Sequence, residues 1–265
     1  MNQPTPSLDT PTFGVRANQG LLFVTRRWLA IIIVLTGLYA LLPFTAPIFM
    51  RLGLTNIGNL VYDINSPLCH QYAFRTWFLF GEQPAYPRQT ANVAGLQPFE
   101  SFSAPIIAAD SMYATQNPPP NLAEWNPDTL MLARGFRGNA QMGYKVAQCE
   151  RNVAIYTSLF LGCLIFSIPR VRRNLRTAPI WLYVLVGLLP IGIDGFTQLL
   201  SEPPFSLFAM YESSPLFRTL TGALFGLMNA WLALPYLAES MRQTQQEIET
   251  KLARRQARLA NRLSA

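Results

Sequence analysis

Residues 28–50 read WLAIIIVLTGLYALLPFTAPIFM, a stretch without a charged side chain that arginines flank on both sides. A helix needs about 20 mostly apolar residues to cross the hydrocarbon core of a bilayer. We therefore predict a membrane-spanning helix here, bent near its far end by Pro43 and Pro47. The stretch is too long, and follows too long a polar leader, for a cleaved signal peptide.

The composition of the whole chain also favours a membrane protein. Of its 265 residues, 50% are hydrophobic and only 13% are charged, about half the charged share of an average soluble protein. The net charge is +7, but the basic residues lie mostly beside apolar stretches and on the C-terminal tail, so no specific nucleic-acid partner is expected. Three cysteines and a single histidine, His70, exclude a disulfide-rich scaffold and a multi-histidine metal centre.

Three further apolar stretches predict spans at residues 152–168, 178–200 and 219–237. The first of them measures roughly 25 Å as a helix, enough to cross only if flanking side chains snorkel or the bilayer is thin. Gly222 and Gly226 in the last stretch have the spacing of close helix packing. The sequence thus predicts an all-α membrane protein whose membrane domain, residues 21–237, contains four transmembrane helices.

The placement of arginines predicts the orientation, because cationic side chains collect on the cytoplasmic side of short loops. Residues 169–177 carry four arginines, the flank of the first span carries three, and the tail after residue 237 carries six lysines or arginines. In a four-span arrangement all three segments lie on one side. Both termini are therefore predicted to be cytoplasmic, in a multi-pass protein of the cell membrane, while residues 51–151 and 201–217 face outward.

Three segments outside the spans have compositions of their own. Residues 1–20 are polar and hold three prolines, which predicts a disordered tail. Residues 82–141 hold eight prolines among Asn, Gln and Ser, which predicts an irregular insertion, either a binding cap or a poorly ordered loop. Residues 238–265 predict a basic amphipathic helix, which lies on anionic lipid headgroups or is a solvated tail. Its apolar stripe consists of Ile248, Leu252, Leu259 and Leu263.

Polar residues that are distant in the sequence are predicted to meet near the outer membrane face. By helical rise, Asp194 lies in the outer third of its span, and Gln198 follows one turn later on the same face. Arg151 begins one neighbouring span, and Arg218 and Thr221 begin another, at the same level. Because an aspartate inside a span is costly unless paired, Asp194 is predicted to contact Arg218 or Arg151. Such a cluster is either a functional site or a structural salt bridge that locks the helices together.

Cys69, His70 and Cys149 are predicted to lie in the same outer layer. Thiolate and imidazole are ligands of zinc and other transition metals, so these three side chains are candidate metal ligands. The alternative is a disulfide between Cys69 and Cys149, which an oxidising outer side favours. The spacing ranks the disulfide above the metal, and either outcome requires the two sulfur atoms to lie close together.

Several short motifs occur together in the chain. They are Cys69-His70-Gln71 followed by Arg75, Cys149-Glu150-Arg151-Asn152, Asp194-Gly195-Phe196-Thr197-Gln198, Glu212-Ser213-Ser214 and Arg218-Thr219-Leu220-Thr221-Gly222. In this combination the chain resembles an uncharacterised family of small prokaryotic integral membrane proteins, a domain of unknown function. The resemblance adds Gln71, Arg75 and Glu212 to the candidate polar cluster. Asn152 stands where the family has a second cysteine and Phe74 where it has an acidic residue, so a metal site shared with the family would lack one ligand here.

Two classes of function follow from these observations. The first is a membrane-embedded site that binds a metal ion or an anionic or lipid-linked ligand, with catalysis left open. The second is a scaffold subunit of a larger membrane complex, in which the cluster is a salt-bridge and disulfide brace. The sequence contains no Walker loop, dinucleotide-binding fingerprint or nucleophile elbow. The candidate residues are Cys69, His70, Gln71, Arg75, Cys149, Arg151, Asp194, Gln198, Glu212, Arg218 and Thr221.

Overall fold

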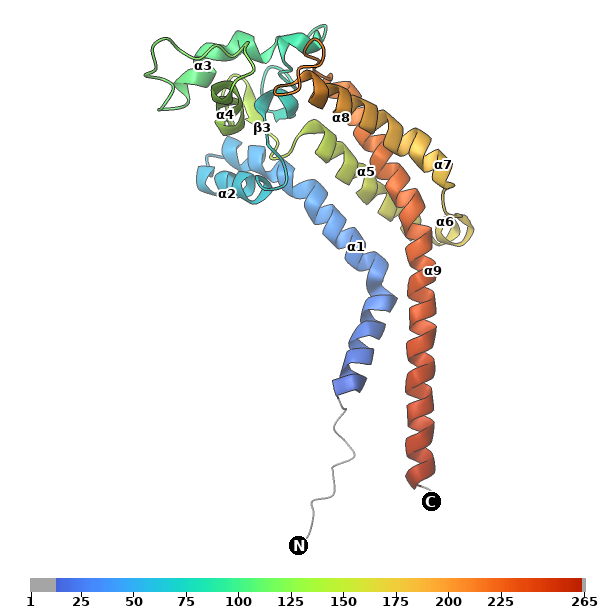
Figure 1. The fold of residues 1–265 in the computed structure, drawn as a ribbon. Coiled ribbons are helices and arrows are strands. Elements are labelled where there is room, and N and C mark those ends of the chain that lie inside the picture. The colour runs from blue at the N-terminus through green and yellow to red at the C-terminus, as the bar shows by residue number, and fades with distance from the viewer. Residues whose placement is uncertain (1–12, 264–265) are drawn as a thin grey trace.

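The computed structural model describes residues 13–263, most of which are helical. Long helices run side by side from a folded cap toward the opposite end of the molecule, where α1 begins and α9 ends (Figure 1). The long elements are α1 (Phe13–Arg51), α5 (Glu150–Ser167), the continuous segment α7–η4–α8, and α9 (Pro215–Leu263). In the third of these, α7 (Ile180–Leu182) and the π-helical η4 (Tyr183–Leu188) lead directly into α8 (Leu189–Ser201).

In the described part of the chain, three helices are long and apolar enough to cross a membrane. They are Arg16–Arg51, Ile180–Ser201 and Pro215–Arg258. They coincide with three of the four predicted spans. The fourth, residues 152–168, forms α5, which is only 18 residues long and begins with the polar side chains of Glu150, Arg151 and Asn152.

Large apolar side chains stay exposed on the outer faces of these helices. Leu38 of α1 is 64% exposed and Phe196 of α8 is 66% exposed. A soluble protein rarely leaves such side chains uncovered over a contiguous surface. Exposure of this kind agrees with helices whose outer faces contact lipid tails.

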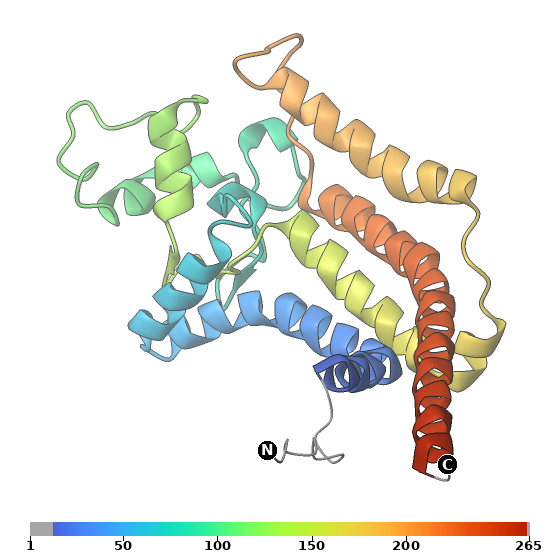
Figure 2. The same cartoon turned by 60° about the horizontal axis from the view of Figure 1, so that its bottom comes forward.

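α5 lies at the centre of the long helices, between α1 and α9, and α8 lies on the other side of α9 (Figure 2). Glycines allow α9 to approach α5 closely. A Cβ atom at Gly226 would lie 2.1 Å from Ser158 Oγ and 2.2 Å from the Ile155 carbonyl oxygen. A Cβ atom at Gly222 would lie 2.7 Å from the carbonyl oxygen of Arg151. The close helix packing predicted from the spacing of these two glycines is confirmed.

The cap comprises residues 52–149. Its elements are α2 (Thr55–Asn65), η1 (Ala73–Arg75), β1 (Phe78–Leu79), η2 (Gln89–Ala91), η3 (Phe99–Phe102), α3 (Ser103–Ala108), α4 (Pro127–Gly135), β2 (Gly138–Asn139) and β3 (Gly143–Lys145). The strands form an antiparallel sheet in the order β1-β3-β2, with Phe78 opposite Lys145. The all-α prediction is therefore wrong for the cap, because strands of two or three residues leave no alternating pattern in the sequence.

An aromatic core packs the proline-rich insertion. Phe74, Phe78, Tyr86, Phe99 and Phe102 are buried in a single cluster, and the rings of Phe78 and Tyr86 meet edge to face with centroids 4.9 Å apart. Such pairs bury large apolar areas without regular secondary structure. Residues 82–141 are thus part of a packed subdomain, and the alternative of a poorly ordered loop is wrong.

The first helix begins earlier than predicted. Residues 13–20, which the sequence assigns to a disordered tail, form the first turns of α1, and residues 1–12 lie outside the described residues. The start of the helix has a simple cause. Pro11 is the last helix-breaking proline before Pro43, so nothing in between interrupts the backbone hydrogen bonds.

The basic C-terminal segment continues α9 without a break as far as Leu263. Ile248, the first member of its apolar stripe, is buried, and the next residue, Glu249, forms a 2.8 Å ion pair with Arg26 of α1. This part of the stripe is therefore covered within the protein. The side chains of Leu259 and Leu263 lie outside the described residues.

Candidate functional site

The predicted polar residues gather where the cap meets the ends of the long helices. α5 and α9 have their first turns at this junction, and α8 has its last turns there (Figure 1). Because successive helices alternate in direction, the start of one lies level with the end of the next. Arg151, Asp194 and Arg218 are brought together in this way from three helices.

Glu212, in the loop before α9, is the centre of an ion-pair network. One edge of the Arg75 guanidinium binds it, with Nε 2.8 Å from Oε1 and Nη2 2.8 Å from Oε2, and Arg218 donates to the same carboxylate. Burial alone would raise the pKa of Glu212, but Arg75 and Arg218 together hold it below its ordinary value. A bidentate pair of this kind fixes orientation as well as charge.

Arg218 and Arg75 extend this network to α5 and α8. The Arg218 guanidinium lies 3.5 Å from the fully buried carboxylate of Glu150 and donates to Gln198 Oε1 across 3.3 Å. Arg75 also pairs with Glu202, which accepts a 3.0 Å hydrogen bond from Gln198. The network therefore connects the cap to three of the long helical elements.

Asp194 pairs with Arg151, one of the two partners expected from the sequence. The carboxylate is buried, and its second oxygen accepts a 3.3 Å hydrogen bond from the hydroxyl of Tyr211. Arg218, the other expected partner, binds Glu212 instead. The Nε atom of Arg151 is buried without a hydrogen-bond partner in the described part of the chain.

The two predicted cysteines lie together at the edge of this network. The main-chain N–H of Cys149 donates a 3.2 Å hydrogen bond to Cys69 Sγ, and both residues are free thiols. Hydrogen bonding from the Cys149 thiol, against the opposing effect of burial, lowers the pKa of Cys69 to about 6. The same hydrogen bond and burial together raise the pKa of Cys149 well above its ordinary value. Cys69 is thus the thiolate of the pair at neutral pH.

A buried lysine supports the loop that carries Cys69. Lys145 of β3 is fully buried, and its ammonium group donates to the carbonyl oxygens of Gln71 at 2.7 Å, Arg134 at 2.6 Å and Ala133 at 3.3 Å. Burial lowers the pKa of Lys145 to about 7, an effect that the nearby Cys69 opposes. The lysine therefore fixes the backbone next to the thiol and supplies positive charge beneath it.

The predicted metal site finds no support. His70 is exposed, and its ring stacks on Tyr72 with centroids 5.4 Å apart. Within residues 13–263, no group of three or more His, Cys, Asp or Glu side chains is arranged to hold a metal ion. The structure thus places the two sulfur atoms together and leaves the imidazole outside the pair.

Two other predicted residues bind backbone instead of joining the ion-pair network. Thr221 donates to the carbonyl oxygen of Phe217 one turn earlier in α9, across 2.9 Å. The side chain of Gln71 donates to the Tyr62 carbonyl oxygen at 2.8 Å, while its own backbone adopts a left-handed conformation with a φ of 57°. Both residues stabilise the local conformation around the site.

Three residues of the site, Glu202, Tyr211 and Lys145, were not predicted from the sequence. Glu202 had a usable signal, because it follows Gln198 by four residues and so continues the same helix face. No sequence pattern indicated Tyr211 or Lys145. A buried lysine in a cap, for example, has no distinctive neighbours in the sequence.

A cavity of about 200 Å³ opens between these groups. Three arginines line it together with both cysteines and the amides of the site. The full set is Cys69, His70, Gln71, Tyr72, Arg75, Cys149, Arg151, Asn152, Gln198 and Arg218. Among the described residues, no carboxylate belongs to this lining, because the acidic partners of the arginines lie behind them. The wall therefore presents hydrogen-bond donors and positive charge.

Comparison with known proteins agrees with the membrane assignment. "Uncharacterized protein MJ1492" from Methanocaldococcus jannaschii is 29% identical over 97 residues, which cover 37% of this chain and 56% of that protein, so the match spans about half the length of this relative. No solved structure matches the chain. Residues 137–232 match a family described as "Predicted membrane protein (DUF2085)". This part of the chain, which includes α5, α8 and the first turns of α9, is therefore similar to a family of predicted membrane proteins.

Proposed function

We propose that the chain is a four-span membrane protein in which α5 is the fourth span and the cap faces outward. Two observations support this arrangement. α5 lies between α1 and α9 (Figure 2), and the arginine-rich α6 (Pro169–Asn174) follows it at the end away from the cap (Figure 1). With both termini on the arginine-rich side, the cytoplasmic face carries the excess of positive charge.

We propose further that the cavity beneath the cap binds a small ligand, free or lipid-linked, through one anionic group such as a carboxylate or a phosphate. The observation that carries this proposal is the composition of the cavity wall, which contains three arginines and no carboxylate from residues 13–263. Guanidinium groups bind such anions through paired, charge-assisted hydrogen bonds. Because the ion pairs behind the wall preorganise the arginines, little side-chain order is lost on binding.

Arg151 is the arginine best placed to bind the ligand. Arg75 and Arg218 are held by two or more acceptors each, whereas Arg151 pairs with Asp194 through Nη2 alone. Its buried Nε–H has no partner among the described residues, and an unpaired buried donor is costly. Because the Arg151 side chain lines the cavity, an anionic group bound there would accept from its guanidinium group.

The Cys69 thiol provides a direct test of this proposal, because it lines the same cavity. The rates at which iodoacetate and iodoacetamide alkylate Cys69 are measured by peptide mass spectrometry on the purified protein, relative to a free thiol. The proposal predicts that the anionic reagent is favoured over the neutral one. Arg151→Gln should reduce that preference about tenfold, because one nearby charge is lost.

Two further variants serve as controls, one for the loss of charge and one for folding. Arg134→Gln removes the same charge from an exposed position of the cap outside the cavity, and should leave the preference unchanged. The double variant Arg151→Gln/Asp194→Asn removes both charges of the buried pair and so preserves folding if Arg151→Gln does not. Equal preference for the two reagents in the unmodified protein would reject anion binding.

The charge network also supports the second class of function, a structural brace. Arg75, Arg218 and their acidic partners join the cap, α5, α8 and α9. A brace without ligand binding predicts that Arg151→Gln lowers stability while the preference for iodoacetate is absent from the start. The alkylation ratio therefore separates the two functions.

A further inference from the structure

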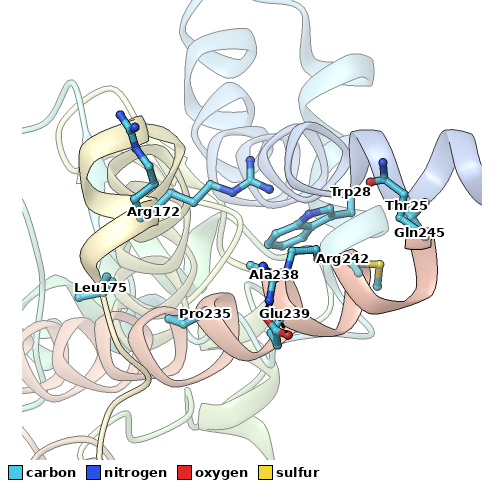
Figure 3. A pocket seen from close by; sticks show the side chains of 11 residues that line it. Thr25, Trp28, Arg172, Leu175, Pro235, Ala238, Glu239, Arg242 and Gln245 are labelled. Atoms are coloured by element: carbon cyan, nitrogen blue, oxygen red, sulfur yellow. Dashed lines mark hydrogen bonds and ion pairs between the residues drawn. The ribbon is translucent and has the colours of Figure 1, made fainter. Parts of the chain in front are cut away.

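A second cavity lies at the opposite end of the helices, between α1, α6 and α9 (Figure 3). Its volume is about 500 Å³. Trp28 of α1 forms one wall, and Arg172 extends from α6 toward its ring (Figure 3). Arg242 of α9 lines the cavity from the other side. Three elements that are distant in sequence thus enclose one space.

The lining carries an excess of positive charge. Arg172, Arg173 and Arg242 line the cavity together with one acidic residue, Glu239, which leaves two positive charges uncompensated. Glu239 pairs with Arg242, with Nη2 at 2.9 Å and 2.8 Å from the two carboxylate oxygens. The Arg172 guanidinium lies 5.8 Å from the centroid of the Trp28 ring, and within the described residues no carboxylate is paired with it. Its donors remain available for an anion.

The remainder of the lining is apolar. Trp28 is 4% exposed, and Leu175 and Met241 face the same space. A cavity for a free inorganic anion has no need of such a surface, whereas a lipid brings a charged headgroup and apolar chains together. The mixed lining therefore fits an amphipathic ligand.

The position of the cavity along the helices agrees with this ligand. Trp28 is the first residue of the uncharged stretch 28–50, and Arg242 follows the end of the predicted span 219–237 by about one turn. Both residues lie where the helices leave the hydrocarbon core. Tryptophan and arginine are the side chains that favour this boundary.

From this arrangement we propose that the cavity binds the phosphate of an anionic phospholipid, with Arg172 and Arg242 as the phosphate ligands and Trp28 beside the glycerol and upper acyl chain. Binding here would tie α1, α6 and α9 together at the side of the membrane away from the cap. It does not depend on the ligand of the outer cavity.

Native mass spectrometry of the full chain in detergent micelles tests this site. Dioleoylphosphatidylglycerol or dioleoylphosphatidylcholine is added in trace amounts, and the fraction of protein with one bound lipid is measured. The anionic lipid should bind at least several-fold more tightly than the zwitterionic one. The double variant Arg172→Gln/Arg242→Gln should lower its affinity by about tenfold or more, because two charges next to the phosphate are lost.

The matched control is Arg254→Gln/Arg258→Gln, which removes two exposed charges from the part of α9 beyond the cavity. This variant should change the affinity less than twofold. All four positions are exposed, so neither variant is expected to unfold the protein. An equal loss in both variants would show a diffuse attraction to the basic helix and overturn the site. Displacement of the lipid by millimolar inorganic phosphate would show that the cavity prefers the free anion, and would overturn the lipid assignment.

Discussion

The main-chain N–H of Cys149 donates to Cys69 Sγ across 3.2 Å, which joins the residue before α5 to a cap loop 80 positions earlier in the chain. The contact places a thiol pair on the wall of the cavity that three arginines line. The reactivity of these two thiols therefore tests the geometry of the site, the fold of the cap and the position of α5.

Cys69 should react as a thiolate at neutral pH. Because donation from the Cys149 thiol lowers the pKa of Cys69 to about 6, the rate of alkylation by neutral iodoacetamide should rise through about pH 6 and become constant above it. Cys149→Ala removes that donor and should move the midpoint upward by at least one pH unit. A midpoint near the ordinary thiol value in the unmodified protein would show that the hydrogen bond is absent.

Mild oxidation should join Cys69 to Cys149 within one chain. Diamide treatment followed by peptide mapping is expected to find a linked peptide lighter than its two reduced parts by two hydrogen atoms, since a disulfide requires α-carbons within about 7 Å. Cys163 is fully buried between the helices and should stay reduced. Cross-linked dimers without the intramolecular link would contradict the structure of the site.

Loss of Asp194 should destabilise the protein strongly. In Asp194→Ala the Arg151 guanidinium loses its only carboxylate partner in the described structure, and breaking a buried pair costs roughly 3 to 5 kcal/mol. Asp63→Ala breaks an ion pair whose aspartate side chain is 66% exposed, and should cost at most about 1 kcal/mol. Urea unfolding in detergent compares the two, and similar losses would place Asp194 at a solvated surface.

Gly226→Ala should separate α9 from α5. Its Cβ would lie 2.2 Å from the Ile155 carbonyl oxygen, so a backbone must move, at a cost of about 1 to 3 kcal/mol or more. Gly192→Ala in α8 has no atom within 4 Å of the new Cβ and should be neutral or slightly stabilising. Thermal unfolding of both variants measures the difference, and a tolerated Gly226→Ala would argue against the close helix contact.

The sequence predicted those features that depend on local composition. Uncharged stretches such as residues 28–50 placed the long helices. The cost of an aspartate in such a helix predicted that Asp194 pairs with Arg151 or Arg218, and Arg151 is the partner in the structure. The packing of the cap could not be predicted in this way. Phe74, Phe99 and their neighbours have no regular spacing, and only the folded chain brings them into one core.

The candidate site, too, could be predicted from the sequence only in part. Spacing along helices identified Asp194 and Gln198, but the orientation of a side chain in an irregular loop has no periodic signal. For that reason His70 was predicted beside the sulfur atoms, whereas its ring stacks on Tyr72. α5 has only 18 residues and carries Glu150 and Arg151 in its first turn, so its length and hydropathy do not identify it as a span.

In the proposed topology the cap and the arginine-rich end lie on opposite sides of the membrane, which requires α5 to cross. Single cysteines are introduced at Met112 in the cap, where the side chain is 74% exposed, and at Asn174, the exposed last residue of α6. Intact cells are treated with a membrane-impermeant maleimide, and the labelled peptides are identified by mass spectrometry. Met112→Cys should be labelled from outside and Asn174→Cys only after permeabilisation. Labelling of both from the same side would contradict this topology.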